Sequence, residues 1–265
     1  TGIARSANAF SPRLGVVYRI KPTISLFSSY SNSFFVNTGT DIYGNVLPPS
    51  IIDQYELGIK NIFFSGRLTV NVTGYRIINN NLAQTAEFDK NGNPNNDSKL
   101  KELTGQTTSD GVELDITAIP VKGLAIMAGY SYNNMRYTKT PDTKGSYVEG
   151  ERLVTTPAHT ANGTVFYTFQ EGKFKNLKFG LSTFYTGKRF GGWNNTKGQA
   201  QNYSRLIPIT AFSTIDISAG YAISKFSFLL KLSNLTNTYN YYVHENYSIN
   251  PIAPRQWIGT LSYKF

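Results

Sequence analysis

The segment DGVELDITA (110–118) decides the fold class of this chain, because its side chains alternate strictly between apolar and polar. Its two faces carry different residues: Val112, Leu114, Ile116 and Ala118 on one, and Glu113, Asp115 and Thr117 on the other. A period of two residues is the period of a β-strand whose faces meet different surroundings. The segment is therefore predicted to be a strand with one apolar and one polar face.

The residues PRQWIGTLSYKF (254–265) repeat this pattern. One face carries Trp257, Gly259, Leu261, Tyr263 and Phe265, and the other carries Ile258, Thr260, Ser262 and Lys264. These residues are predicted to form a second amphipathic strand.

Alternating segments recur along the whole chain, whereas long stripes with the helical period of 3.6 residues are missing. About eleven strands are expected, each close to the roughly 9–11 residues that a tilted membrane strand needs. They lie at residues 14–20, 23–30, 55–60, 67–75, 110–118, 124–132, 160–169, 177–185, 213–221, 226–233 and 254–265.

The connections between these segments alternate in length. Short ones fall at residues 21–22, 63–66, 120–123, 170–176 and 224–225, and long ones at 35–50, 80–107, 138–155, 187–208 and 234–254. This alternation is typical of outer-membrane barrels, which have tight periplasmic turns and long extracellular loops. A soluble β-sandwich also has alternating strands, but its loops do not sort by length in this way. We expect an all-β, antiparallel transmembrane β-barrel whose apolar face meets lipid and whose polar face meets a wet interior.

The composition excludes several classes of protein. The 265 residues include no cysteine, which excludes a disulfide framework and a thiolate metal site. The net charge of +10 is spread singly along the chain, which argues against a nucleic-acid partner. No stretch reaches the roughly 18 apolar residues of a membrane-spanning helix. Residues 1–15 lack the pattern of a signal peptide, so a mature or truncated chain is expected.

The predicted strands form only part of a closed barrel. Counted back from the periplasmic C-terminus, their number is odd, so the chain is expected to begin in an extracellular loop. Single-chain bacterial barrels have even strand numbers, and an open sheet edge in lipid leaves backbone groups unpaired at several kcal/mol each. About eleven strands are half of the 22 in plugged outer-membrane transporters. A companion segment is therefore expected.

Five stretches together resemble the barrel of TonB-dependent receptors of the ferric-siderophore type. They are SPRLGVVYRIKPTISLFSSYSNSF (11–34), YELGIKNIFFSGRLTVNVTGYRI (55–77), SDGVELDITAIPVKGLAIMAGYSY (109–132), LKLSNLTNTYNYY (230–242) and APRQWIGTLSYKF (253–265). The resemblance covers nearly the whole chain. It implies that residues 1–265 are the C-terminal part of such a barrel, without its plug and its first half.

The resemblance also implies function and partners. It implies uptake of a ferric siderophore across the bacterial outer membrane, driven by the TonB–ExbB–ExbD system acting on an N-terminal plug. The expected partners are the plug, the remaining barrel strands, outer-membrane lipid with lipopolysaccharide, and the barrel-assembly machinery. The last strand would carry the assembly signal for that machinery in Leu261, Tyr263 and Phe265.

Charged side chains on the polar faces are expected to dock the plug. They are Glu56, Lys60, Glu113, Asp115, Asp216 and Lys231. Glu113 and Asp115 are two residues apart, about 7 Å along a strand, which would also suit paired acids for general acid–base work. Docking of the plug is the favoured interpretation, because inward carboxylates commonly serve a wet or plugged lumen.

The long loops supply the candidate cargo contacts. Residues 187–208 carry several cations and no acid, so they can hold an anionic or aromatic chelate, or equally the phosphates of lipopolysaccharide. The loop at 234–254 is rich in tyrosine. The residues predicted to contact cargo are Arg189, Trp193, Tyr203, Tyr239, Tyr241, Tyr242 and His244.

Catalysis, a resident cofactor and a metal site are not expected. His159 and His244 are the only histidines, and the first is interpreted as an interfacial residue. Residues 89–102 begin like a calcium loop, but Pro94 replaces the turn glycine and Leu100 replaces the bidentate glutamate. An ordinary solvated loop is therefore predicted there.

Three alternatives stay open at this point. The cargo can be haem, a vitamin-like molecule or an oligosaccharide, because aromatic loops serve all of these. The chain can be a barrel component for surface interactions, whose loops bind another protein. An outer-membrane enzyme is the least favoured hypothesis.

Overall fold

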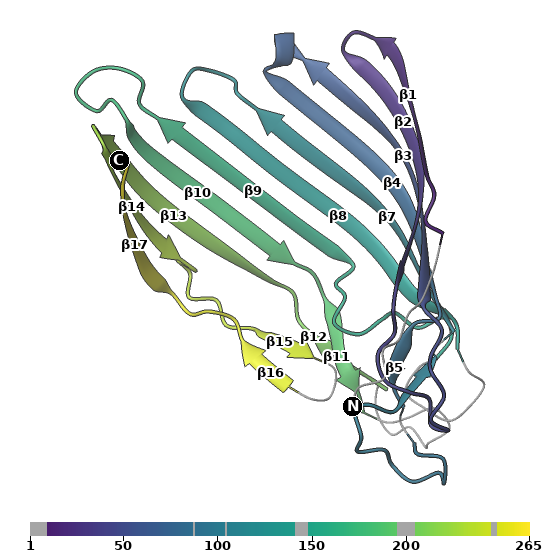
Figure 1. Cartoon of the computed structure of the whole chain (residues 1–265). Helices are drawn as coiled ribbons and strands as arrows, with labels where there is room; N and C mark the ends of the chain where they lie inside the picture. Colours follow the sequence, from purple (N-terminus) through teal and green to yellow (C-terminus); the bar gives the residue numbers. More distant parts are fainter. Residues whose placement is uncertain (1–9, 87, 104, 141–147, 195–204, 245–247) are drawn as a thin grey trace.

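The computed structural model describes residues 10–86, 88–103, 105–140, 148–194, 205–244 and 248–265. Its main element is an eleven-stranded antiparallel sheet, which bends like part of a barrel wall (Figure 1). The strands are β1 (Arg13–Lys21), β2 (Ile24–Phe35), β3 (Ser50–Phe63), β4 (Leu68–Asn80), β7 (Gln106–Ala118), β8 (Leu124–Lys139), β9 (His159–Thr168), β10 (Leu177–Thr186), β13 (Phe212–Ile223), β14 (Phe226–Ser233) and β17 (Gln256–Tyr263).

Each strand of this sheet pairs with the one before and the one after it in the chain, from β1 at one edge to β17 at the other. Such a meander follows from the tight turns, because antiparallel neighbours can be joined by very few residues. The sequence-based prediction of eleven antiparallel strands is confirmed. Among the described residues β1 and β17 do not pair with each other, so the sheet is open at both edges.

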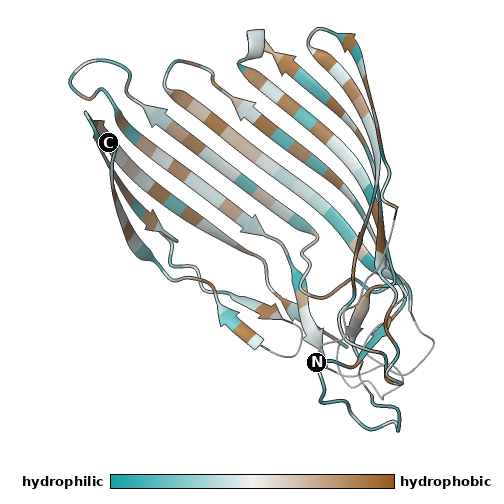
Figure 2. Cartoon of the chain, viewed as in Figure 1, coloured by the Kyte–Doolittle hydropathy of each residue, from teal (hydrophilic) through white to brown (hydrophobic). Residues whose placement is uncertain are grey.

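The strand register separates two faces of the sheet, which we call the apolar face and the polar face. On the apolar face, Leu114 lies opposite Val72 on β4 and Tyr130 on β8. At the far edge, Trp257 lies opposite Leu232. Bands of hydrophobic and hydrophilic residues therefore alternate along every long strand (Figure 2).

Large side chains of the apolar face are open to the surroundings rather than packed in a core. Leu57 is 65% exposed and Leu261 is 64% exposed. Contiguous apolar surface of this extent is unfavourable in water but not in hydrocarbon. The chemistry of this face therefore fits lipid.

Aromatic side chains cluster where the strands end at the short turns. Phe169 packs against Tyr167, Phe174 and Phe179, with ring centroids 5.0–6.4 Å apart. Tyr and Trp rings favour the boundary between hydrocarbon and water, and outer-membrane barrels carry aromatic girdles there. The cluster marks one such boundary.

On the polar face, three aromatic rings lie over glycines directly opposite them on the next strand. The register pairs Phe27 with Gly58, Tyr75 with Gly111, and Phe166 with Gly180. A Cβ on any of these glycines would collide with the facing ring. Each ring thus covers backbone that has no side chain of its own, and the missing Cβ leaves the room that the ring occupies.

Replacing Gly111 by alanine is expected to destabilise the barrel, whereas replacing Gly74 is not. A Cβ on Gly111 would stand 2.6 Å from the carbonyl oxygen of Tyr132, besides meeting the Tyr75 ring. Overpacking of this kind costs about 1–3 kcal/mol. At Gly74 on the neighbouring strand the nearest atom is 3.9 Å away. Thermal unfolding, followed by heat-modifiable gel mobility, should show a lower midpoint for Gly111→Ala alone. Equal midpoints would contradict this account of the glycine.

The turns and loops gather at opposite ends of the sheet, as predicted. The short turns and the C-terminus lie together at one end, and the long loops lie at the other (Figure 1). The shortest turns include a 3-10 turn at Phe64–Gly66 between β3 and β4. Among the described residues, no helix is long and apolar enough to cross a membrane.

Three of the long loops contain short hairpins that the sequence did not reveal. They are β5 (Ala83–Thr85) with β6 (Lys101–Leu103), β11 (Arg189–Trp193) with β12 (Leu206–Ile209), and β15 (Tyr241–His244) with β16 (Ser248–Pro251). Strands of three to five residues are too short for a period of two to stand out. Their pairing gives the loops a defined shape.

Candidate ligand-binding surface

The last long loop, residues 234–255, is anchored at its base by Asn234. The Asn234 backbone N–H donates to Asp216 Oδ1 at 2.8 Å. Its side-chain amide donates to the carbonyls of Thr238 and Ala253, at 2.9 and 3.0 Å. Because Ala253 lies just before β17, one side chain joins the start of the loop to its end. The base of the loop is therefore rigid, which lets the residues above it hold defined positions.

Three exposed tyrosines lie in this loop, and we call them together the tyrosine surface: Tyr239, Tyr241 and Tyr242. Tyr239 is 70% exposed and Tyr242 is 57% exposed. The rings of Tyr239 and Tyr241 meet edge to face, with centroids 5.0 Å apart. A hydrogen bond with Tyr239 raises the pKa of the Tyr241 phenol. Fixed rings with polar tips can stack on an aromatic ligand and bond it at low entropic cost.

Arg189, a predicted cargo contact, lies buried beneath this surface and is only 6% exposed. Its guanidinium donates to the carbonyls of Thr210 (3.3 Å) and Tyr241, and to Asn240 Oδ1 at 3.1 Å. It also lies over the Phe212 ring, 5.4 Å from the centroid. Burial lowers the pKa of Arg189.

These contacts make Arg189 a link between two loops. Its own strand, β11, lies in the loop after β10, whereas Asn240 and Tyr241 belong to the loop after β14. A buried cation with several acceptors is held in place, since losing them would leave the charge uncompensated. The guanidinium therefore positions the tyrosine surface and offers little of itself to a ligand.

Phe212 and Asn240 are neighbours of the candidate site that the sequence analysis missed. Phe212 is buried, packs edge to face with Tyr242 at 6.4 Å, and supports Arg189 from below. Phe212 begins β13 on the face that carries Thr214 and Asp216. An aromatic residue on this otherwise polar face was the feature of the sequence that could have revealed it. No feature of the sequence could have revealed Asn240, because its hydrogen-bond partner Arg189 lies far away in the chain.

Trp193, Tyr203 and His244 were also predicted to contact cargo, and Arg205 is a further cation of the loop at residues 187–208. Trp193 is buried at the end of β11. Arg205 forms an ion pair with Glu151 of the preceding long loop. Tyr203 lies outside the described residues, and of His244 the structure describes only its backbone pairing with Ser248. The structure thus brings Arg189 together with Tyr241 and Tyr242 but does not place Tyr203.

The six residues predicted to dock a plug all lie on the polar face. The register places Lys60 and Asp115 on either side of Asn71, and Glu56 and Glu113 in neighbouring rows. Lys231 forms an ion pair with Asp216 at 2.7 Å. Asp216 therefore has a local role as well, because it also accepts the hydrogen bond from Asn234.

Several of these charges keep capacity for a further partner. Glu56 accepts hydrogen bonds from Ser29 and Gln54, at 2.8 and 2.7 Å. In the described part of the chain, Lys60, Glu113 and Asp115 take part in none of the ion pairs. A polar face with unpaired charges suits contact with another polar body or with water.

The segment that begins like a calcium loop forms a compact turn instead. Asp89 Oδ1 accepts the backbone N–H groups of Asn91 and Asn93, at 2.8 and 2.9 Å. Asp41 makes the same turn in another loop, accepting from Tyr43 and Asn45 at 2.9 and 2.7 Å. The described residues include no group of three or more His, Cys, Asp or Glu side chains that would hold a metal ion.

This turn is expected to open in acid. The hydrogen bond from the Asn93 backbone is the main cause that lowers the pKa of Asp89 below its ordinary value. Because the pKa of Asp89 is lower in the folded than in the unfolded chain, ionisation of Asp89 stabilises the turn above about pH 4, the pKa in the unfolded chain. This stabilisation is lost as the pH falls through the pKa of Asp89 in the folded chain. Hydrogen exchange of residues 89–93, corrected for intrinsic rates, should show protection above pH 5 that disappears in acid.

Two substitutions test the role of the carboxylate in this turn. Asp89→Asn keeps one oxygen acceptor, so protection should persist without the pH dependence. Asp89→Ala should remove protection at every pH. A pH-dependent loss of protection in Asp89→Asn would contradict the assignment to the Asp89 carboxylate.

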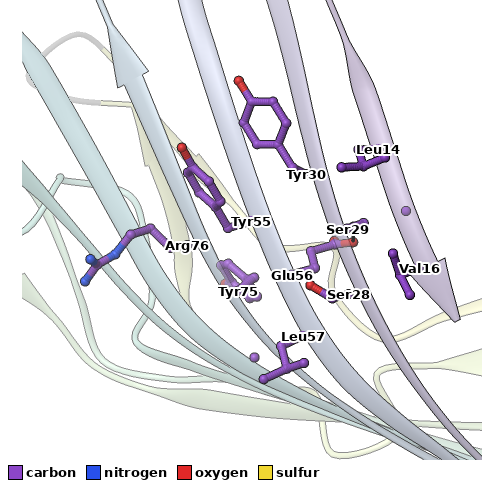
Figure 3. A pocket seen from close by; sticks show the side chains of 12 residues that line it. Leu14, Val16, Ser28, Ser29, Tyr30, Tyr55, Glu56, Leu57, Tyr75 and Arg76 are labelled. Carbon is purple, nitrogen blue, oxygen red and sulfur yellow. Dashed lines mark hydrogen bonds between the residues drawn. The ribbon is translucent and has the colours of Figure 1, made fainter. Parts of the chain in front are cut away.

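A hollow of about 680 Å³ lies on the side of the sheet formed by β1 to β4. Figure 3 shows Tyr30 and Tyr55 side by side at one end and Leu57 at the other. The Tyr30 and Tyr55 centroids are 5.1 Å apart. The hollow is lined mainly by residues of the apolar face, and it is open where the small residues Ser28 and Gly74 replace larger side chains. This hollow therefore faces lipid and is no cargo site.

The residues of the last strand and the interfacial histidine lie where their patterns place them. Leu261 and Tyr263 lie on the apolar face of β17. Phe265 packs against Tyr263, with centroids 5.2 Å apart. His159 begins β9 and its Nδ1 shares a hydrogen bond of 2.7 Å with the Tyr130 hydroxyl. His159 thus belongs to an aromatic group at the loop end of the apolar face.

Comparison with known families identifies the barrel. Residues 1–235 match the family model described as TonB dependent receptor-like, beta-barrel. The metal-pseudopaline receptor CntO of Pseudomonas aeruginosa is 26% identical over 268 residues, which is 100% of this chain and 35% of that protein. The ferrioxamine B receptor of Salmonella typhimurium is 25% identical, over 97% of this chain and 34% of the receptor.

Solved structures have the same fold. The ferripyoverdine receptor of the outer membrane of Pseudomonas aeruginosa, bound to ferripyoverdine, superimposes with a TM-score of 0.75 at 21% identity. The match covers 99% of this chain and 34% of that receptor. The chain thus spans about a third of the length of the relatives it matches.

Proposed function

Because the chain belongs to the family of TonB-dependent receptor-like β-barrels, we propose that it forms the C-terminal half of the β-barrel of a receptor that imports a ferric siderophore. The family consists of receptors and transporters of the bacterial outer membrane, and the chain is a membrane component rather than an enzyme. Residues 1–265 would supply eleven of 22 strands. The plug and the other strands would come from the rest of the protein.

The open edges of the sheet carry the structural part of this proposal. Every residue of β1 and of β17 is exposed. Unpaired backbone groups at such edges cost several kcal/mol each in lipid, so both edges need partner strands. Eleven further strands would satisfy both edges and close the barrel.

The polar face supports a plug as the body inside that barrel. Lys60, Glu113 and Asp115 lie on this face and form no ion pairs within the described residues. A plug with complementary charges would pair with them. TonB, energised with ExbB and ExbD, would act through that plug, whose movement would open a path for the cargo.

The tyrosine surface is the single observation that carries the cargo proposal. Its rings are exposed at the loop end of the sheet and are fixed from below by Arg189 and Asn234. Rigid aromatic side chains with hydroxyl tips suit a siderophore, which combines apolar or aromatic parts with many oxygen atoms. The relatives that are receptors for ferrioxamine B and for metal-pseudopaline support a metal chelate as the cargo class.

Uptake of radiolabelled iron tests this function. Cells with and without the complete gene would be given iron in several chelates, under iron limitation and with a TonB-deficient control. Uptake of at least one ferric chelate should require both the gene and TonB. A zinc or nickel arm would detect a chelate of another metal. Unchanged uptake of every chelate would reject the siderophore and leave haem, a vitamin-like molecule, an oligosaccharide or a surface interaction.

A further inference from the structure

A row of polar side chains crosses the apolar face just above its last apolar residues, toward the long loops. The register aligns Arg76 with Asp110 and Asp110 with Asn134. Asn134 follows Tyr132 on the same face, so it lies about 7 Å further along the strand. In a membrane barrel this is the level at which hydrocarbon gives way to lipid headgroups.

Two arginines meet in this row around a single amide oxygen. Arg136 Nε and Arg152 Nη1 both donate to Asn134 Oδ1, at 2.8 and 3.0 Å. A backbone bridge pairs Arg136 with Arg152, so their side chains leave the backbone on the same side. Further bonds to the carbonyls of Gly150 (2.7 Å) and Asn133 (2.6 Å) hold the two guanidinium groups in place.

The arginine pair carries the excess positive charge of this row. Arg76 is paired with Asp110 at 2.6 Å, and Glu151 is paired with Arg205. Among the described residues, no carboxylate lies within ion-pair distance of Arg136 or Arg152. Burial, and then the charge of Arg136, lower the pKa of Arg152. The two guanidinium groups are thus held close together against their electrostatic repulsion, and an anion bound between them would offset this repulsion.

Much of the donor capacity of the pair is unused. A guanidinium has five N–H groups, and two of them are used on each arginine, which leaves three on each. Fixed guanidinium forks match the geometry of phosphate oxygens and form strong charge-assisted bonds with them. The side chains are also positioned in advance, so little rotamer entropy remains to be lost on binding.

We propose that Arg136 and Arg152, held by Asn134, bind the phosphate group of an anionic glycolipid in the outer leaflet. The position favours a lipid over a soluble anion, because the pair sits on the outer wall directly above an apolar surface. Acyl chains of the same molecule would lie along the apolar residues below. The proposal rests on the outer-membrane setting and does not depend on the cargo.

Binding of purified lipid A to the complete receptor in detergent tests the site. Bisphosphorylated lipid A, its dephosphorylated form and inorganic phosphate would be compared by native mass spectrometry and a competition assay. The double variant Arg136→Gln, Arg152→Gln should bind bisphosphorylated lipid A about 30-fold more weakly. The control Lys90→Gln, Lys139→Gln removes two exposed lysines and should bind as the wild type does.

Each outcome decides the proposal. Preference for the phosphorylated lipid, lost only in the arginine variant, supports it. Equal binding of the dephosphorylated lipid, or unchanged binding by the arginine variant, overturns it. Competition by inorganic phosphate below millimolar concentration would assign the site to a soluble phosphate and overturn the glycolipid. If the glutamine variant does not fold, Arg136→Lys with Arg152→Lys keeps both charges and should still weaken binding several-fold through loss of the forks.

Discussion

Replacing Arg189 by methionine should release the last extracellular loop from the loop after β10 and lower uptake of the cargo at least tenfold. The guanidinium is the shared partner of Thr210, Asn240 and Tyr241, and its loss removes the hydrogen bonds to all three. Hydrogen bonds to a charged group contribute about 1.5–3 kcal/mol each. Losing about 3 kcal/mol would raise the open population of the loop roughly 100-fold.

Hydrogen exchange and uptake together measure this effect. Amides of Tyr241–His244 and of Ser248, Ile249 and Asn250 should exchange faster in Arg189→Met, whereas amides of β13 and β14 should not change. Lys188→Met is the matched control, because the neighbouring lysine is exposed. Arg189→Lys should fall between the two, since it keeps the charge but loses the fork. Unchanged exchange and uptake in Arg189→Met would show that the two loops hold together without the guanidinium.

Removing the tyrosine surface should abolish tight binding of the cargo while the barrel still folds. Aromatic contacts at the centre of an interface cost about 2 kcal/mol or more each when truncated. The double variant Tyr241→Ala, Tyr242→Ala is therefore expected to weaken cargo binding by roughly 1000-fold. Tyr242→Ala also uncovers Phe212, which packs against it edge to face.

Matched variants separate the ring from the hydroxyl. Tyr241→Phe removes only the hydroxyl that interacts with Tyr239, so a smaller loss of several-fold is expected. Tyr43→Ala is the control, because this tyrosine is 75% exposed in a different long loop. Isothermal titration with the chelate found in the uptake experiment measures the affinities. If Tyr43→Ala weakens binding as much as the double variant does, the cargo contacts lie elsewhere.

The strands and their faces could be predicted because both depend on local pattern. The alternation in DGVELDITA identified β7, and the same period identified the other ten strands of the sheet. The predicted boundaries fell short in long strands: β3 begins at Ser50 rather than Tyr55, and β8 extends to Lys139. There the alternation weakens, because the strands rise beyond the lipid and polar residues follow on both faces.

The candidate site could be predicted only in part. Tyr239, Tyr241 and Tyr242 lie exposed in the predicted loop. Arg189 was predicted to contact cargo, but it is buried against carbonyl groups, and Arg205 of the same basic loop pairs with Glu151. The segment at Asp89 was predicted only as an ordinary solvated loop, although Asp and Asn favour such turns and Gly92 takes a positive φ there.

The amino-acid sequence alone determined the eleven strands, their two faces and the alternation of turns and loops, because neighbouring residues in a strand already record what each face meets. Only the tertiary structure decided which loop cations are structural. Arg189 finds its partners in Tyr241 and Asn240, and Arg205 finds its partner in Glu151, some 50 residues away in each case. A local sequence pattern cannot predict such long-range contacts, since they depend on how the loops of neighbouring hairpins pack above the sheet.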